Sequence, residues 1–205
     1  MRLIAENVSV WRGGREVIRA LSFAAGAGSG VILTGRNGAG KTTLIRVLAG
    51  FIRPESGRVR LEGGKADASL GEQCHLIGHG NGLRSSLTVR ENTRFWAEFL
   101  AGEASSAMVE QALGRLGLAD LAEIPAGYLS AGQRRRLALA RLLVAARPIW
   151  LLDEPTSSLD TASQEIVARL MAEHLAGGGL IVAATHLPLA VAGLDEVRLD
   201  QRVPA

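Results

Sequence analysis

The sequence has little or none of several features, and each absence removes a class of protein. Among its 205 residues the only cysteine is Cys74, which excludes an internal disulfide and a cysteine-rich metal or c-type haem attachment site. No apolar run reaches the ~20 residues that a membrane-spanning helix needs, and the first residues lack a signal-peptide pattern. We therefore expect a soluble chain from a reducing cytosol.

Lysine is also scarce, because only Lys41 and Lys65 stand among the 23 basic residues. The net charge of +3 and the pI near 9.7 raise the possibility of a nucleic-acid partner. The basic residues are spread along the chain, however, and only Arg134–Arg136 forms a short run. We expect no nucleic-acid partner, and a hydrophobic content of 47% is ample for the core of one domain.

One stretch of the sequence fits the phosphate-binding pattern G-x-x-x-x-G-K-[ST] at every fixed position. An apolar run, 30–34, precedes it, and a helical pattern starting at Thr43 follows it. Strand, loop and helix in this order are the setting that the pattern needs. The stretch consists of Gly35, Arg36, Asn37, Gly38, Ala39, Gly40, Lys41 and Thr42.

The residues of this loop suit the binding of ATP with Mg²⁺. Glycines let successive backbone N–H groups curl around a phosphate, and the N-terminus of the following helix adds partial positive charge. Lys41 is expected to reach the β- and γ-phosphates, Thr42 to bind the metal, and Thr43 to complete the nucleotide contacts. The alternative is a glycine-rich turn without a ligand, and the complete match in the right setting argues against it.

Two apolar segments end in polar residues that suit hydrolysis. The segment 149–154 ends in Asp153 and Glu154, and the segment 180–186 ends in His186. The carboxyl ends of strands in an open α/β sheet are where ligands bind. We expect Asp153 to hold the metal through water, Glu154 to act as general base and His186 to contact the γ-phosphate. Without the phosphate loop, the two acids would be no more than a solvated turn.

A second anion site is expected where the helix of residues 134–146 begins. Ser130, Ala131, Gly132 and Gln133 precede that helix, so their serine hydroxyl and backbone amides lie at its N-terminus. A capped helix start is common and needs no ligand. Trp11 lies at the end of a strand-like segment and has two possible roles. Its ring could stack on a nucleotide base, or it could simply pack against the protein.

The remaining pattern is that of an α/β protein. Residues 3–11 and 17–23 predict an antiparallel strand pair around Gly13-Gly14, and residues 58–61, 74–77 and 197–199 predict further strands. Helices are expected over 87–116, where Thr88 and Glu91 form a capping box, and over 157–175. Phe95, Trp96 and Phe99 lie at helical spacing and are expected in the core of this helical part.

These motifs, in their order and spacing, resemble those of the nucleotide-binding domain of ABC transporters. The resemblance spans nearly the whole chain, and it includes Ser157–Asp160, which adds Asp160 to the nucleotide-site residues. It implies a phosphate-loop NTPase fold with a mainly parallel core sheet and an antiparallel β subdomain. It also implies one ABC ATPase domain over 1–205, with a helical subdomain at about 85–145 inserted between about 1–84 and 146–205. A head-to-tail homodimer is implied, in which Ser130 and Gly132 of each copy touch the ATP of the other.

Two departures from the usual ABC pattern resemble the CcmA family. His79 stands where glutamine is common, beside the metal or the nucleotide, and Ala131 replaces a common glycine. CcmA proteins are ATP-binding subunits of the haem exporter complex of c-type cytochrome maturation. The resemblance implies a peripheral protein on the cytoplasmic face of a bacterial inner membrane, with CcmB-like and CcmC-like membrane partners that handle haem. No haem site is evident in the residues, and another small ABC transporter or a soluble ABC ATPase remains the alternative.

Overall fold

The computed structural model describes residues 1–199, so the last residues of the expected domain, 200–205, lie outside the described part. The strands are β1 (Arg2–Arg12), β2 (Arg15–Gly26), β3 (Gly30–Thr34), β4 (Ser56–Glu62), β5 (Cys74–Ile77), β6 (Ile149–Asp153), β7 (Leu180–Ala184) and β8 (Leu194–Arg198). The α-helices are α1 (Lys41–Leu48), α2 (Val89–Ala101), α3 (Ser106–Arg115), α4 (Ala131–Leu139), α5 (Arg141–Val144) and α6 (Thr161–Ala176). Short 3₁₀ turns occupy Gly71–Gln73, Ala119–Leu121 and Ala126–Tyr128.

The strands of the described part form two sheets. The outer sheet has the order β2-β1-β4 and is antiparallel, and the core sheet has the order β5-β6-β7-β3-β8 and is parallel throughout. Gly13 and Gly14, both with positive φ, make the turn between β1 and β2, as the sequence predicts. The α/β class, the antiparallel pair and the mainly parallel core sheet are therefore confirmed.

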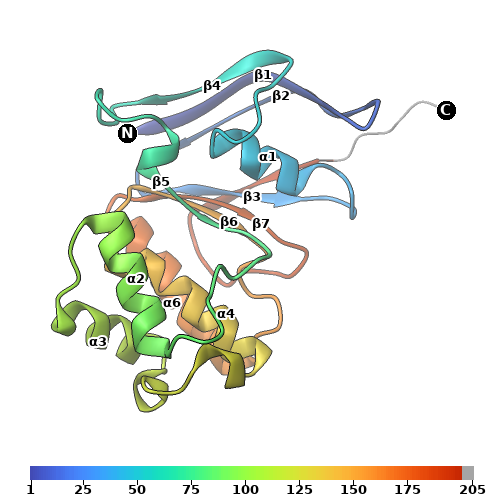
Figure 1. The fold of residues 1–205 in the computed structure, drawn as a ribbon. Helices are drawn as coiled ribbons and strands as arrows, with labels where there is room; N and C mark the ends of the chain where they lie inside the picture. The colour runs from blue at the N-terminus through green and yellow to red at the C-terminus, as the bar shows by residue number, and fades with distance from the viewer. Residues whose placement is uncertain (200–205) are drawn as a thin grey trace.

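Helix α1 lies between the two sheets, and the longer helices lie on the opposite face of the core sheet (Figure 1). Every residue of β6 is buried, as expected for a parallel strand covered on both faces. Ile149 and Leu151 pack with α1 and the outer sheet, whereas Trp150 and Leu152 pack with the helices. This alternation gives the described residues two large hydrophobic cores, one on each face of the core sheet, and a small third cluster lies among the helices at Ala97, Ala112 and Val144.

The helix starts follow from capping side chains. Thr88 and Glu91 form the expected capping box of α2. The helix expected over 134–146 begins earlier, at Ala131, because Ser130 and Gln133 form a second capping box, and it is interrupted at Ala140 before α5. The helix expected from residue 157 begins later, at Thr161, because the carboxylate of Asp160 accepts a hydrogen bond from the Ser163 backbone N–H.

Two of the three aromatic residues of α2 lie outside the core, so the expectation is wrong for Phe95 and Phe99, whereas Trp96 packs against the cluster of Ala97, Ala112 and Val144. Phe95 is 51% exposed and Phe99 is 70% exposed, while Trp96 is only partly buried. The rings of Phe95 and Phe99 stack on each other 5.9 Å apart, on the outside of the helix. The apolar side chains of α2 that are buried are Val89 and Ala97, and Phe95 and Phe99 mark an exposed face of α2.

No helix within residues 1–199 combines the length and the hydropathy needed to cross a lipid bilayer.

Acidic pH is expected to destabilise the fold through buried His75 of β5. Its Nε2 lies 2.7 Å from the Ala145 carbonyl oxygen, and burial lowers the pKa of His75 from 6.5 to about 4. Between these values the unfolded chain binds a proton that the folded chain does not bind. The free energy of unfolding should therefore fall by about 3 kcal/mol as the pH is lowered from 6.5 to 4.

Urea denaturation at a series of pH values measures this effect. His75→Gln keeps an N–H donor for the Ala145 carbonyl but cannot titrate, so its unfolding free energy should depend less steeply on pH in this range. His174, whose pKa burial also lowers, remains in both proteins and contributes equally to both. Equal slopes for the parental and His75→Gln proteins would contradict the assignment to His75.

Candidate active site

The phosphate-binding loop joins β3 to α1 at one end of the core sheet. Helix α1 begins at Lys41, and its N-cap, Gly40, has no side chain to pair with the first backbone N–H groups. Those N–H groups and the helix dipole favour a bound anion. Gly40 has a φ of 101°, and a Cβ atom there would lie 2.9 Å from the carbonyl oxygen of Val17. The shape of the loop therefore requires glycine at this position.

The side chain of Lys41 lies within this loop and is buried. Its Nζ donates hydrogen bonds to the carbonyl oxygens of Gly35 and Arg36, at 2.7 and 3.3 Å. A buried ammonium group needs acceptors of this kind because it has left water. The loop therefore holds a full positive charge beside the partial positive charge of the α1 N-terminus.

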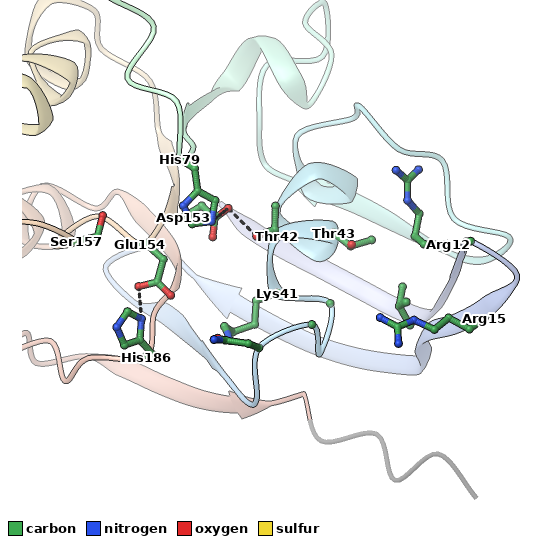
Figure 2. A pocket seen from close by; sticks show the side chains of 15 residues that line it. Arg12, Arg15, Lys41, Thr42, Thr43, His79, Asp153, Glu154, Ser157 and His186 are labelled. Carbon is green, nitrogen blue, oxygen red and sulfur yellow. Dashed lines mark hydrogen bonds and ion pairs between the residues drawn. The ribbon is translucent and has the colours of Figure 1, made fainter. Parts of the chain in front are cut away.

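The residues expected to hold the metal meet at the end of β6. Oδ2 of Asp153 accepts a hydrogen bond from Oγ1 of Thr42 at 2.8 Å and lies 3.7 Å from Nε2 of His79 (Figure 2). No group of three His, Cys, Asp or Glu side chains in residues 1–199 could hold a metal by itself. One carboxylate and one hydroxyl fit Mg²⁺, which usually takes one or two protein oxygens and fills its other positions with phosphate oxygens and water.

The carboxylate of Glu154 faces His186 across the same edge of the sheet (Figure 2). Its Oε2 lies 2.9 Å from Nδ1 of His186, a close contact that lacks the geometry of a hydrogen bond. The backbone N–H of Glu154 donates to the Ala184 carbonyl oxygen of β7 at 2.8 Å. The residues that follow β6 and β7 are thus held together by both backbone and side-chain contacts.

The structure gathers most of the expected residues around one cleft of about 950 Å³, a volume suited to a nucleotide. The expected residues that line it are Asn37, Gly38, Gly40, Lys41, Thr42, Thr43, His79, Asp153, Glu154 and His186. Gly35, Arg36 and Ala39 belong to the loop without lining the cleft.

The structure does not bring the other expected residues to this cleft. Ser130, Ala131, Gly132 and Gln133 form the start of α4, where Ser130 and Gln133 bond to each other. Asp160 caps α6, and its hydrogen bonds with Ser163 lower the pKa of Asp160. Trp11 is half exposed and lies in β1 next to Arg12, which does line the cleft.

The cleft also has a basic rim that the sequence reasoning missed. Arg12 and Arg15 project from the β1–β2 hairpin on the side opposite Glu154 and His186 (Figure 2). The two residues pair across the hairpin, and a guanidinium nitrogen of Arg15 lies 3.8 Å from where a Cβ of Gly38 would be. The signal in the sequence was a glycine turn flanked by arginines. Gly13, Val17 and Ser157 were likewise missed as lining residues.

The fold and the cleft together define the class of the protein. Residues 18–157 match the ABC transporter family model. A solved structure from Pyrococcus furiosus, described as an ABC transporter ATP-binding protein, aligns with a TM-score of 0.85. It is 22% identical, and the alignment covers 97% of this chain and 98% of that chain. The protein is an ABC-type ATPase domain that binds ATP.

Two similar proteins show to which family of ABC transporter ATP-binding proteins the chain belongs. The cytochrome c biogenesis ATP-binding export protein CcmA of Rhodopseudomonas palustris strain BisB5 is 56% identical over 195 residues, which is 95% of this chain and 96% of that protein. The protein of the same name from strain HaA2 is 53% identical over 191 residues, which is 93% and 94% of the two chains. The chain belongs to the CcmA family of ABC transporter ATP-binding proteins, which confirms the resemblance seen in its motifs.

A pair of glycine substitutions tests the loop geometry. Gly40 and Gly50 flank α1, both with positive φ, but only a Cβ at Gly40 has an atom within 4 Å. Alanine at either position should cost roughly 1–2 kcal/mol of stability through backbone strain. Gly40→Ala should in addition lower ATP affinity at least about tenfold, because the displaced loop can no longer align its N–H groups with phosphate.

Fluorescence titration with a labelled ATP analogue measures the affinity, and Gly50→Ala serves as the control for strain alone. Equal ATP affinity in the two variants would show that the close approach of Gly40 to Val17 does not shape the phosphate site.

Proposed function

We propose that this chain is the ATP-hydrolysing subunit of the haem exporter complex of c-type cytochrome biogenesis. The observation that carries the proposal is the meeting of Lys41, Asp153, Glu154 and His186 in one cleft. Phosphoryl transfer to water uses the same groups: a lysine in a phosphate loop, a metal-binding carboxylate, a base and a hydrogen-bond donor. The two CcmA relatives are named for cytochrome c biogenesis and export, which supports the transport role.

In the proposed reaction, the chain holds the triphosphate in its loop. Lys41 and the backbone N–H groups of Gly35–Thr43 stabilise negative charge on the β- and γ-phosphates. Mg²⁺, bound with ATP by Thr42 and Asp153 and beside His79, would neutralise further phosphate charge. Glu154 accepts a proton from the attacking water while the water oxygen bonds to the γ-phosphorus and the bond to the ADP oxygen breaks. His186, oriented by Glu154, donates a hydrogen bond to the γ-phosphate.

The start of α4 suggests that two copies act together. Ser130 is exposed and lies outside the cleft, and a Cβ at Gly132 would lie 3.1 Å from the Ser158 carbonyl oxygen. The start of α4 and the segment leading to Asp160 are thus neighbours on one surface. We propose a head-to-tail homodimer in which this surface, with Ser130–Gln133, closes the cleft of the other copy. Trp11, beside the cleft, would stack on the adenine.

The exposed face of α2 is the proposed contact with the membrane subunits. Phe51, Phe95 and Phe99, which we call the aromatic surface, are each at least half exposed. A groove beside Phe51, lined by Trp96 and Leu100, adds apolar depth. We propose that cytoplasmic segments of CcmB-like and CcmC-like proteins cover this surface, which places the chain at the cytoplasmic face of the bacterial inner membrane. Haem would be handled by those partners.

This arrangement gives the parts of the chain separate tasks. Residues 1–84 and 146–205 would bind the nucleotide, and the helical subdomain at 85–145 would carry the Ser130 surface and, together with Phe51, the membrane contact. The side chain of Arg141 connects the two parts, because it lies over the Trp96 ring and also donates a hydrogen bond to the Asn81 carbonyl. Asn81 belongs to the loop that carries His79, so the membrane contact has a short physical connection to the cleft.

Replacing the base tests the hydrolytic role. Glu154→Gln keeps the shape of the side chain but cannot accept the proton, so the steady-state rate should fall by about 10²–10⁴. The variant should still bind ATP and should form dimers at saturating ATP, as measured by light scattering. Glu165→Gln, an exposed substitution on α6, is the control and should leave the rate unchanged. Parental turnover by Glu154→Gln would refute the assignment of the base.

Charges on the aromatic surface test the membrane contact. Phe95→Glu combined with Phe99→Glu should reduce co-purification with the CcmB-like subunit from detergent-solubilised membranes by roughly tenfold, because the contact would bury two unpaired charges. Ile124→Glu, at a separate exposed apolar side chain, is the matched control. The ATPase rate of the isolated chain should not change. Equal recovery of all three proteins with the membrane subunit would exclude this surface as the contact.

A further inference from the structure

Arg135 is a buried cation whose hydrogen bonds go to the turn that carries the proposed base. It belongs to α4 and is 3% exposed. Its Nη2 donates to the carbonyl oxygens of Asp153 and Glu154, at 2.8 and 2.7 Å. Its Nη1 donates to the carbonyl oxygen of Gly78 at 2.7 Å and to Oδ1 of Asn81 at 3.3 Å. A side chain from the helical part is thus inserted among the backbone groups behind the cleft.

Two of these bonds hold the backbone on both sides of Glu154. The Asp153 carbonyl belongs to the peptide group before Glu154, and the Glu154 carbonyl belongs to the peptide group after it. Glu154 has a φ of 52°, in the left-handed region that a residue with a Cβ adopts only when its surroundings impose it. Fixing both flanking peptide groups fixes φ and ψ of Glu154, and with them the direction of its side chain toward His186.

The other bonds hold the loop that carries His79. The Gly78 carbonyl belongs to the peptide group immediately before His79, and Asn81 lies two residues after it. His79 and Glu154 therefore have their backbones fixed by one planar group. A guanidinium suits this task because its N–H donors lie in a rigid plane and point in several directions.

The electrostatic setting accounts for a charged group in this buried position. Burial lowers the pKa of Arg135, and the negative charges of Asp153 and Glu154 raise it. The negative charges of these two carboxylates compensate the positive charge of Arg135. None of the hydrogen bonds described above goes to a carboxylate oxygen. The hydrogen bonds of Arg135 leave the carboxylate oxygens of Asp153 and Glu154 available to the cleft.

We propose that Arg135 is the positioning residue of the hydrolytic site, because its single guanidinium fixes the backbone of Glu154 and of the His79 loop from the helix that begins at Ser130. The proposal rests on the proposed ATPase function. Arg135 touches neither ATP nor the attacking water, and it acts through the residues that do.

Two substitutions test this role in the full-length chain. Arg135→Met removes both the charge and the donors, and it should lower kcat by roughly 10²-fold, because small displacements of a catalytic group have effects of that size. Arg135→Lys keeps the charge but cannot bond the separate carbonyls in one plane, so its kcat should lie between those of the parental and Met proteins. The KM for ATP should change by no more than about threefold in both variants, because Lys41 and its loop are untouched.

A matched control and a double substitution separate positioning from loss of stability. Arg136→Met also removes side-chain hydrogen bonds to backbone carbonyls, those of Leu116 and Gly117, but these lie away from the cleft. It should lower the melting temperature without lowering kcat. In a Glu154→Gln background, Arg135→Met should lower the remaining single-turnover rate by less than about threefold, because the group it positions has lost its function.

The outcomes distinguish this inference from the proposed function. A parental protein without ATPase activity would refute the proposed function itself. An active parental protein together with a folded Arg135→Lys at parental kcat would refute the role of Arg135. Effects of Arg135→Met and Glu154→Gln that multiply independently would also refute it. If Arg135→Met does not fold, Arg135→Lys and its pairing with Glu154→Gln decide the question.

Discussion

The hydrogen bond between Thr42 and Asp153 is the contact on which the rest of the site depends. It joins side chains 111 positions apart in the chain, one in the first turn of α1 and one at the end of β6. The contact exists because β3, β6 and β7 are parallel neighbours in the core sheet, so the segments that leave their carboxyl ends meet at one edge. Lys41, Glu154 and His186 reach the same cleft for the same reason.

The sequence contained enough information for most of this arrangement. Continuous apolar segments such as β6 and β7 predict buried parallel strands, and the polar residue after each strand predicts the functional edge. The capping boxes at Thr88 and Ser130 are local patterns that are read directly from the chain. Single strands and caps are predictable because their determinants lie within a few residues of each other.

The features that could not be predicted depend on tertiary packing. Helical spacing of Phe95 and Phe99 shows that they share a face of α2, but spacing does not show whether that face is covered. Arg134–Arg136 looked like a short basic run, and only the packing of α4 behind β6 shows that Arg135 is buried and bonded. The rim formed by Arg12 and Arg15 likewise depends on how the outer sheet lies over the phosphate loop.

The structure also separates the groups expected to bind phosphate into two surfaces. The loop of Lys41 lies in the cleft, while the helix start at Ser130 lies elsewhere. Two anion-binding helix starts on separate surfaces have a simple explanation if each copy supplies one of them to the ATP of the other. Residues of α4 would then contribute in two directions, Ser130 outward to the second copy and Arg135 inward to the turn at Glu154.

The most direct test of the central claim, that this cleft grips the phosphates of ATP, is an equilibrium binding measurement. Isothermal titration calorimetry with a non-hydrolysable ATP analogue and Mg²⁺ should give one saturable site per chain in the parental protein. Lys41→Ala, which removes the buried ammonium from the loop, should weaken that binding by roughly 10-fold or more, because a charge-assisted contact to phosphate is lost. Equal affinity in the parental and Lys41→Ala proteins would contradict the account.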